Sequence, residues 1–381
     1  MKSKILLFFL SIILVSCTTN NFQEYTNNLI KVDSLRTKLP EYGNYSLSYI
    51  QIYENEFDTL LFAGNVINNS IDVFDLSGEK FRTRIEFQKN GPKSLTTLQG
   101  FYIINYDSIL VFPNSLLHKS LIVGMDSNKI ENLVIQDFRN QEPKIINHVS
   151  STLNPVILNN SKLSFIQYPL FDVESAENIN NEFDFEIIYD LKDSTISEGG
   201  IKYPQFYHGK IWSIYSTLLF RTLGENDLLV YSWSLSDSIY VKSISGEVES
   251  FIAKGVSHKK VLPFTQKPEQ QERIKKTIES INYKGILYDK YRNLYYRVVL
   301  NSTRYDPKIH IDYKAFFDQQ LSIITLDSSF NMIDETILDK NVYTYSSMFV
   351  GPKGLYISKA NVRNNTYEED YLLYDIFNLQ R

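Results

Sequence analysis

Short apolar segments followed by turn residues recur along most of the chain. Six similar copies are found, each led by a polar residue or Gly, and their central positions are Leu60, Ile109, Leu163, Leu228, Leu294 and Leu355. Neighbouring copies stand between 49 and 66 residues apart. Each copy is followed by a second apolar segment, most clearly residues 71–76, which end at the turn Ser77-Gly78. Further short segments before and after these two predict four strands per repeat.

Six repeats of four strands predict an all-β fold, a six-bladed β-propeller. The last repeat ends after its third strand at Asp375, and the segment from Leu29 to Leu35 can supply the missing fourth strand. This pairing would close the ring and remove exposed sheet edges. The 27 Tyr and 24 Phe, against 15 Gly, also favour a sheet-rich chain. Two packed β-sandwiches are the alternative architecture.

One segment, residues 268–280, has a helical pattern. Pro268 stands near its start, acidic residues come first and lysines later, as the helix dipole favours. Its apolar stripe is narrow and consists of Ile274, Ile278 and Ile281. We therefore expect one helix that lies on the propeller between the fourth and fifth blades.

The N-terminus has the pattern of an export signal. Lys2 and Lys4 precede an apolar stretch, residues 5–15, which is too short to span a bilayer. The stretch ends in Leu14-Val15-Ser16-Cys17, which resembles a lipobox, and Cys17 is the only cysteine of the chain. The resemblance implies a signal peptide at residues 1–16, lipidation of Cys17, a tether at residues 17–28 and a propeller at residues 29–381. An ordinary secretory signal that happens to contain a cysteine is the alternative.

Residues 18–21 indicate where such a lipoprotein would reside. They read Thr-Thr-Asn-Asn and lack the acidic run that resembles a surface-export signal in Bacteroidota lipoproteins. Residue 18 is also not the aspartate that is linked to inner-membrane retention in enteric bacteria. We expect an outer-membrane lipoprotein that faces the periplasm and contacts the membrane through its lipid.

The predicted loops differ in length between the two faces of the propeller. Connections between strands one and two, and between strands three and four, are short. The other connections include residues 169–182, 198–214, 253–283 and 301–319. Long loops on a rigid scaffold are where binding residues concentrate. All five histidines fall on this long-loop face, namely His118, His148, His208, His258 and His310.

A dense run of aromatic residues, 203–212, leads into the fourth blade on this face. Aromatic rings stack on sugars or peptides, and arginine binds carboxylates with two parallel hydrogen bonds. The residues that we expect to contact a ligand near the channel mouth are Arg221, Arg297, Tyr207, His208 and His118. Alanine at Arg221 or Arg297 should then weaken binding and leave the melting temperature nearly unchanged. Alternatively, the rings pack between blades and the arginines are satisfied by carbonyl groups.

Motifs for catalysis, metals and cofactors are missing from the sequence. His310-Ile311-Asp312 is the only close pair of a histidine and a carboxylate, and there is no H-E-x-x-H or G-x-S-x-G motif. No glycine-rich phosphate loop is present, and a net charge of −5 argues against nucleic-acid binding. We expect no metal, cofactor or catalytic residue, although a glycosidase with paired carboxylates stays open.

Two further motifs carry a family resemblance. They are Lys89-Asn90-Gly91-Pro92, with Gly100 to Ile109 after it, and the segment from Tyr288 to Arg297. With the lipobox, they make the chain resemble a Bacteroidota lipoprotein family of unknown function related to the six-bladed propeller lipoproteins. Related lipoproteins carry Gly-x-Gly-Pro, and Lys89 stands where the first glycine would be. The resemblance implies an envelope location and a propeller, and no particular activity.

Two functions are compatible with these observations, and a purely structural envelope protein that binds no small molecule is a third option. The first is a ligand-binding or protein-interaction propeller of the cell envelope, whose long-loop face takes a saccharide, a peptide or an envelope protein. The second is a carbohydrate-active hydrolase or lyase that uses carboxylates on the same face.

Overall fold

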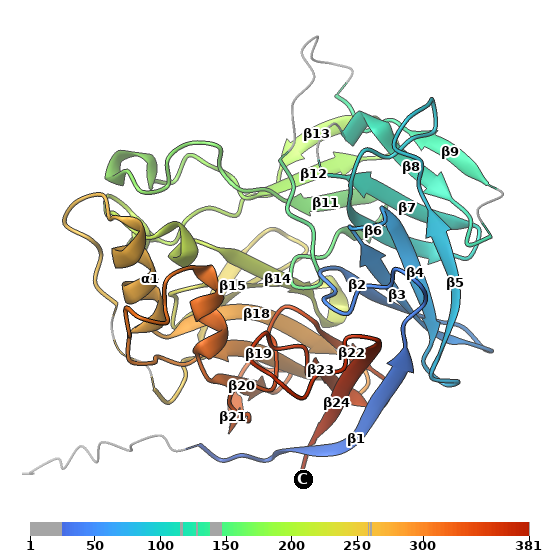
Figure 1. Ribbon diagram of the computed structural model, residues 1–381. Coiled ribbons are helices and arrows are strands. Elements are labelled where there is room, and N and C mark those ends of the chain that lie inside the picture. Colours follow the sequence, from blue (N-terminus) through green and yellow to red (C-terminus); the bar gives the residue numbers. More distant parts are fainter. Residues whose placement is uncertain are drawn as a thin grey trace, which may run out of the picture.

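The computed structural model describes residues 25–114, 117–126, 129–137, 147–257, 259 and 261–380. Within them, 24 strands form six four-stranded antiparallel sheets, which are arranged as the blades of a ring (Figure 1). This confirms the predicted six-bladed propeller. The lipobox cysteine, Cys17, lies outside the described residues, as does His258.

Each blade uses four strands, which follow one another from the axis outward. Blade 1 consists of β2 (Ile50–Glu54), β3 (Thr59–Asn65), β4 (Ser70–Asp75) and β5 (Lys80–Glu86); blade 2 of β6 (Leu98–Asn105), β7 (Ser108–Pro113), β8 (Ser120–Val123) and β9 (Ile130–Leu133); and blade 3 of β10 (Ile157–Asn159), β11 (Lys162–Ile166), β12 (Glu186–Asp190) and β13 (Thr195–Glu198). Blade 4 consists of β14 (Leu219–Leu223), β15 (Leu229–Trp233), β16 (Ser238–Lys242) and β17 (Val248–Ile252); blade 5 of β18 (Asn282–Asp289), β19 (Leu294–Leu300), β20 (Leu321–Leu326) and β21 (Met332–Ile337); and blade 6 of β22 (Met348–Gly351), β23 (Gly354–Ser358), β24 (Tyr371–Leu379) and β1 (Leu29–Lys38). The first strands of blades 4 and 5, 5 and 6, 6 and 1, and 1 and 2 contact one another, so these strands line the axis.

The N-terminal strand completes the last blade, as predicted. β1 runs antiparallel to β24 from the pair Leu29 and Leu379 to the pair Lys38 and Tyr371. The residues before β1 lie against blade 5, where the backbone N–H of Asn28 donates to Asp334 at 2.9 Å. Thr26 also donates to this carboxylate. The described end of the expected tether is therefore held against β21.

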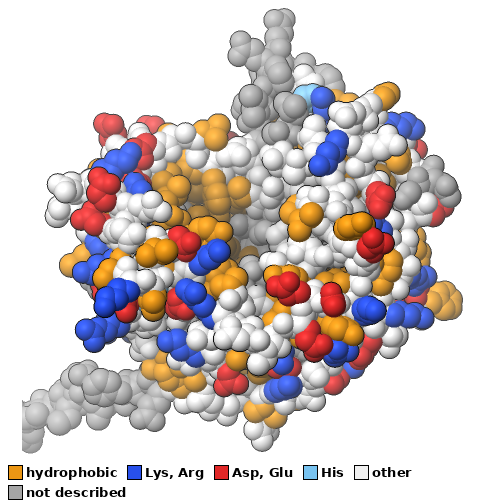
Figure 2. Space-filling model, viewed as in Figure 1, with side chains coloured by type: hydrophobic (Ala, Val, Ile, Leu, Met, Phe, Trp, Pro, Cys, Tyr) orange, Lys and Arg blue, Asp and Glu red, His pale blue; other side chains and the backbone are white. Residues whose placement is uncertain are grey.

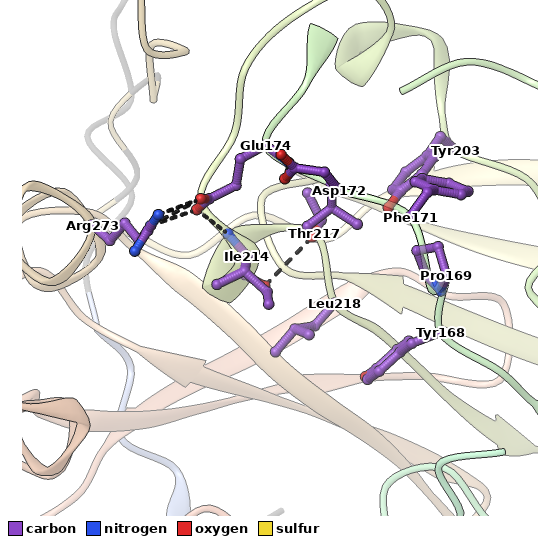
Figure 3. A pocket seen from close by; sticks show the side chains of 11 residues that line it. Tyr168, Pro169, Phe171, Asp172, Glu174, Tyr203, Ile214, Thr217, Leu218 and Arg273 are labelled. Atoms are coloured by element: carbon purple, nitrogen blue, oxygen red, sulfur yellow. Dashed lines mark hydrogen bonds and ion pairs between the residues drawn. The ribbon is translucent and has the colours of Figure 1, made fainter. Parts of the chain in front are cut away.

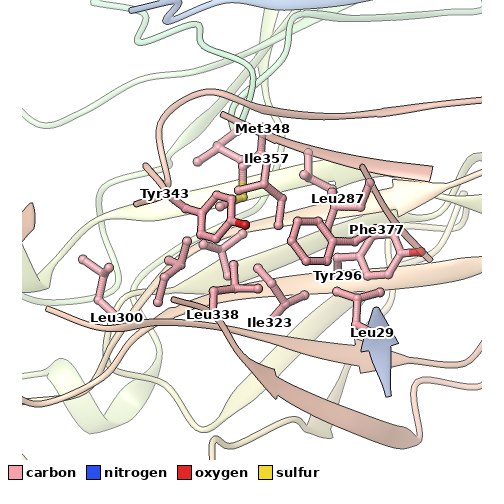
Figure 4. Close-up of a cluster of buried hydrophobic side chains, with 14 of the residues drawn as sticks. Leu29, Leu287, Tyr296, Leu300, Ile323, Leu338, Tyr343, Met348, Ile357 and Phe377 are labelled. Carbon is pink, nitrogen blue, oxygen red and sulfur yellow. The ribbon is translucent and has the colours of Figure 1, made fainter. Parts of the chain in front are cut away.

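Apolar side chains fill the spaces between blades. One cluster joins blades 5 and 6 and includes Tyr296, Ile323, Met348 and Ile357 (Figure 4). Leu29 of β1 belongs to the same cluster, so closure of the ring also buries apolar surface. Inner strands such as β19 are buried along their whole length, whereas outermost strands such as β17 are largely exposed.

A segment between blades 2 and 3 crosses the inside of the ring. The N–H of Thr152 donates to Ser48 beside blade 1 at 3.0 Å, whereas the carbonyl of Leu153 accepts from Arg221 of blade 4 at 3.0 Å. Blades 1 and 4 lie opposite each other in a ring of six. The side chain of Leu153 also packs on Gly285 of blade 5. Residues 150–154, which we call the plug, therefore cross the axis of the ring between blades 1 and 4.

The predicted helix is present as α1 (Gln270–Ile278). Glu269 caps it, and the side chains of Glu269 and Glu272 form a reciprocal capping box. Ile274 and Ile278 are buried against Phe316 of the 3-10 helix η6 (Tyr313–Asp318). No helix among the described parts of the chain is long and apolar enough to span a membrane.

The strand bounds confirm the difference in loop length. The turns between the first two strands of a blade are as short as residues 106–107, 160–161 and 352–353. On the other face, the connections cover residues 167–185, 199–218, 253–281 and 301–320. Helix α1 and η6 belong to this long-loop face, above blades 4 and 5 (Figure 1).

Candidate functional site

Arg221 lies inside the protein between blades 3 and 4. Its guanidinium donates to the Glu186 carboxylate and to the Ser164 hydroxyl, both at 2.6 Å. It also donates to the carbonyl groups of Ser164 at 2.7 Å and Pro155 at 3.0 Å. The side chain has 0% exposure. The structure thus gives Arg221 a structural role and does not place it at a channel mouth, so a ligand contact by this residue stays a prediction without support from its position.

Arg297 has an equivalent position between blades 4 and 5. Its guanidinium donates to the carbonyl groups of Ala253 at 2.6 Å and Ser236 at 2.7 Å, and it lies 3.5 Å from the Tyr283 ring centre. Burial lowers the pKa of Arg297 to about 10, which leaves it charged at neutral pH. The alternative interpretation, an arginine satisfied by carbonyl groups, describes this arrangement.

The other three residues expected to bind a ligand lie in different environments. Tyr207 is fully buried, and its hydroxyl donates to the carbonyl of Ser216 at 2.8 Å. His208 is half-buried and uses Nε2 to donate to the carbonyl of Tyr203 at 2.8 Å. His118 lines a separate cavity of about 310 Å³ beside Pro92. The five residues therefore do not converge on one site.

The aromatic run at residues 203–212 forms part of a buried core. Tyr203 and Tyr207 pack on Trp233 of blade 4, with ring centres 5.3 and 5.8 Å away. Trp212 donates from its indole N–H to the carbonyl of Tyr207 at 3.0 Å. These rings build the wall of a site and do not present their faces to solvent.

The histidines of the long-loop face are not gathered either. His148 and His310 are each 2% exposed and bonded to the protein. Among the described residues, no group of three or more His, Cys, Asp or Glu side chains is placed to hold a metal ion.

A pocket of about 310 Å³ opens on the long-loop face above blades 3 and 4 (Figure 3). Its walls come from the loops at residues 167–185 and 199–218 and from α1. Eleven residues line it: Tyr168, Pro169, Phe171, Asp172, Val173, Glu174, Tyr203, Ile214, Thr217, Leu218 and Arg273. Figure 2 shows this face hollowed, with hydrophobic side chains gathered around the hollow.

The pocket combines an apolar lining with apolar side chains exposed at its rim. Phe171 and Ile214 line it and are 36% and 50% exposed, and the adjacent Leu170 is 80% exposed. Exposed apolar groups that adjoin a concave surface are typical of interaction sites. The long-loop prediction covered this segment, but none of these residues was singled out from the sequence.

Two ion pairs lie along one side of the pocket. Arg273 of α1 binds the Glu174 carboxylate through two nitrogens, Nε and Nη2, at 2.7 and 2.6 Å (Figure 3). Asp172 pairs with Lys267 at 2.6 Å. The hydrogen bond from Lys267, followed by that from the N–H of Glu174, holds the pKa of Asp172 below its usual value. This carboxylate stays ionised near neutral pH and is unsuited to act as a general acid.

One unusual charge escaped the sequence analysis. Lys284 lies on β18, the innermost strand of blade 5, and is 3% exposed. Its sequence context, Asn-Tyr-Lys-Gly, gives no sign of burial because lysine at a strand position is ordinarily solvated. Only the assignment of β18 to the axis of the ring could have drawn attention to it.

The comparison with protein families identifies this chain. Residues 19–337 match the family described as a domain of unknown function, DUF4221. The chain belongs to the DUF4221 family. The crystal structure of a DUF4221 member from Bacteroides vulgatus covers 92% of this chain and 97% of its own, with 22% identity and a TM-score of 0.77. This confirms the family that the motifs resembled.

A more distant structure shares the fold of the DUF4221 chain. A protein from Bacteroides fragilis that is described as exported covers 94% of this chain and 97% of its own, with 9% identity and a TM-score of 0.51. At these identities both likenesses show the fold alone. No curated protein matches the sequence.

Proposed function

We propose that this DUF4221 protein is an exported, lipid-anchored binding propeller of the cell envelope. The observation that carries the proposal is the preformed apolar pocket on the long-loop face, whose rim is fixed by the Glu174–Arg273 ion pair. The ligand is a peptide segment or saccharide that inserts one apolar or aromatic group into this pocket.

The size and lining of the pocket support a partial rather than a complete enclosure of the ligand. Its volume of about 310 Å³ is at the lower end for small-molecule sites. One ring or branched side chain fills such a space, while the rest of the ligand contacts Leu170 and Ile214 at the rim. Arg273 and Asp172 add charges that orient polar groups.

Export and anchoring rest on different support. The lipobox ending in Cys17 provides the lipid attachment point, and a structural relative is described as exported. Strand β1 begins only 12 residues after Cys17. The propeller would therefore stay close to the outer membrane, on its periplasmic side.

The binding test uses a soluble form that lacks residues 1–17. Fluorescence titration with short peptides, each with one central aromatic residue, and with neutral oligosaccharides should identify binders from one class. Phe171→Ser and Ile214→Ser should weaken binding by at least tenfold, because each removes apolar surface from the pocket. The matched control is Ile67→Ser, since Ile67 is 69% exposed in the β3–β4 turn of blade 1, away from the pocket.

Two outcomes would overturn the proposal. One is equal affinity in the pocket variants and in Ile67→Ser. The other is turnover of a polysaccharide that disappears when Asp172 or Glu174 is replaced, because this would support the hydrolase or lyase alternative.

A further inference from the structure

Lys284 is a buried cation close to the axis of the ring. Its backbone forms the irregular position between Tyr283 and Gly285 in the pairing of β18 with β19. Gly285, the next residue, packs on Leu153 of the plug. Lys284 therefore lies at the end of β18 that is nearer the long loops, and its ammonium group lies 5.8 Å from the centre of the Phe316 ring in η6.

No acidic group neutralises Lys284 within the described residues. The other buried cations bind several acceptors: Arg221 and Lys242 share Glu186, and Arg297 binds carbonyl groups. Among the described residues, Lys284 has neither an ion pair nor a hydrogen bond, and its ammonium group lies over the Phe316 ring, 5.8 Å from the ring centre. This distance is at the outer limit of cation–π attraction.

A buried lysine without a counter-ion is unusual because of the environment of its ammonium group. Desolvation lowers the pKa of Lys284 to about 8, so the group still carries a charge for most of the time at neutral pH. A buried charge without a partner costs several kcal/mol, and proteins ordinarily pair such groups. Two buried acceptors, Asn282 Oδ1 on the same strand and Gln319 Oε1 directly after η6, also lack hydrogen-bond partners among the described residues.

The surroundings of Lys284 adjoin the pocket. Phe316 packs on Tyr215 with ring centres 4.9 Å apart, and Tyr215 follows the pocket residue Ile214. Phe316 and Tyr215 therefore connect the surroundings of the cation with the segment that lines the pocket.

We propose that Lys284 is the anchor of a second binding site, which accepts the carboxylate of an acidic ligand. The carboxylate supplies the missing counter-ion and forms a charge-assisted hydrogen bond with Nζ. Hydroxyl or amide donors of the same ligand would satisfy the unpaired acceptors. A uronic acid and a peptide with a free C-terminus both have this chemistry. The inference does not depend on the pocket, because it rests on the unpaired charge alone.

Thermal denaturation of the soluble form tests the proposal. The probes are sodium glucuronate with glucose as its neutral analogue, and the dipeptide Ala-Phe with its C-terminal amide, all at one ionic strength set with sodium chloride. At saturation, one carboxylate should raise the melting temperature of the wild-type protein by about 3 °C or more, whereas its neutral analogue should not. The probe that acts distinguishes a saccharide from a peptide ligand.

Lys284→Met keeps the length of the side chain and removes its charge. This variant should lose the shift produced by the carboxylate, and without ligand it should melt at or above the temperature of the wild type. Lys202→Met, which removes an exposed lysine, should keep the shift. The proposal is overturned if neither carboxylate shifts the wild type, if Lys284→Met keeps the shift, or if that variant melts below the wild type without ligand.

Discussion

The carboxylate of Glu186 and the guanidinium of Arg221 form an ion pair of 2.6 Å between blades 3 and 4, and neither side chain is exposed. Glu186 also accepts from Lys242 Nζ at 2.8 Å and from the hydroxyl of Tyr231 at 3.0 Å. Burial by itself would raise the pKa of Glu186, but the charges of Arg221 and Lys242 lower it. The contacts of this carboxylate join two blades through polar groups, in addition to the apolar packing between them.

We expect Arg221→Ala to reduce the free energy of unfolding by about 3–5 kcal/mol, because it leaves part of a buried charge network unpaired. Urea denaturation measures this. Lys353→Ala is the control: it removes an exposed ion pair with Asp33 and should change stability by less than about 1 kcal/mol. If Arg221→Ala unfolds at the same urea concentration as the wild type, the ligand-binding role expected from the sequence gains support.

The sequence was sufficient for the architecture because the architecture repeats. Each apolar repeat, such as those at Leu60 and Leu228, corresponds to one blade, so the number of repeats gives the number of blades. The segment at Leu29 belongs to no complete repeat, which identifies it as the strand that closes the ring. The same patterns contain no information on which side chains from separate blades meet. Arg221 and Arg297 were expected to bind ligands because arginine binds carboxylates with two parallel hydrogen bonds. Their partners are instead protein groups 35 or more residues away in the sequence, among them carbonyl groups.

The plug was also hidden from the sequence. Residues 150–154 are short and polar and resemble any surface loop, and their place in the ring depends on contacts with blades 1, 4 and 5. The pocket is a similar case, since its lining comes from three separate segments. Lys284 was missed because burial of a charge has no local signature.

Gly100 and Ser150 test the fit of the plug. A Cβ atom at Gly100 would lie 2.6 Å from the Cβ of Ser150, which is closer than two carbon atoms can approach. We expect Gly100→Ala to destabilise the protein by about 1–3 kcal/mol. Adding Ser150→Gly removes the clash and should restore most of the loss. If the double variant is less stable than the sum of the two single changes, the plug does not pack against blade 2 as described.

His148 should make stability depend on pH. Its Nε2 donates to the carbonyl of Pro113 at 2.5 Å, and its Nδ1 accepts from the hydroxyl of Ser150 at 2.8 Å. Burial lowers its pKa to about 4. The unfolded chain, with a pKa of about 6.5, then binds more protons than the folded protein between pH 6.5 and 4. Stability is therefore lost as the pH falls through this range.

The expected loss from His148 between pH 7 and pH 5 is about 2 kcal/mol. Urea denaturation at the two pH values measures it, and His148→Gln should reduce the difference by this amount. His208→Gln, the same substitution at a half-buried histidine, provides the matched control. If the wild type and His148→Gln show the same pH dependence of stability, the loss between pH 7 and pH 5 does not come from His148.

Cys17 should carry the lipid. We expect the full-length protein, produced in a Bacteroides host that is grown with labelled palmitate, to become labelled and to be found in the membrane fraction. Cys17→Ser removes the only thiol that can be acylated and should abolish incorporation. A secreted, unlabelled wild-type protein would instead favour an ordinary signal peptide that happens to contain this cysteine.

Closure of the ring by β1 predicts a sharp boundary for truncation. A variant that begins at residue 25 keeps β1 and should melt like the longer soluble form. A variant that begins at residue 39 loses the strand, including the buried Leu29 and Leu35, and exposes the edge of β24 to solvent. Such an edge pairs with other chains, so this variant should elute from size exclusion as large aggregates.

A synthetic peptide of residues 25–38 should restore a soluble monomer by adding the strand in trans. A monomer that begins at residue 39 and melts at the wild-type temperature would show that the other 23 described strands close the ring without β1.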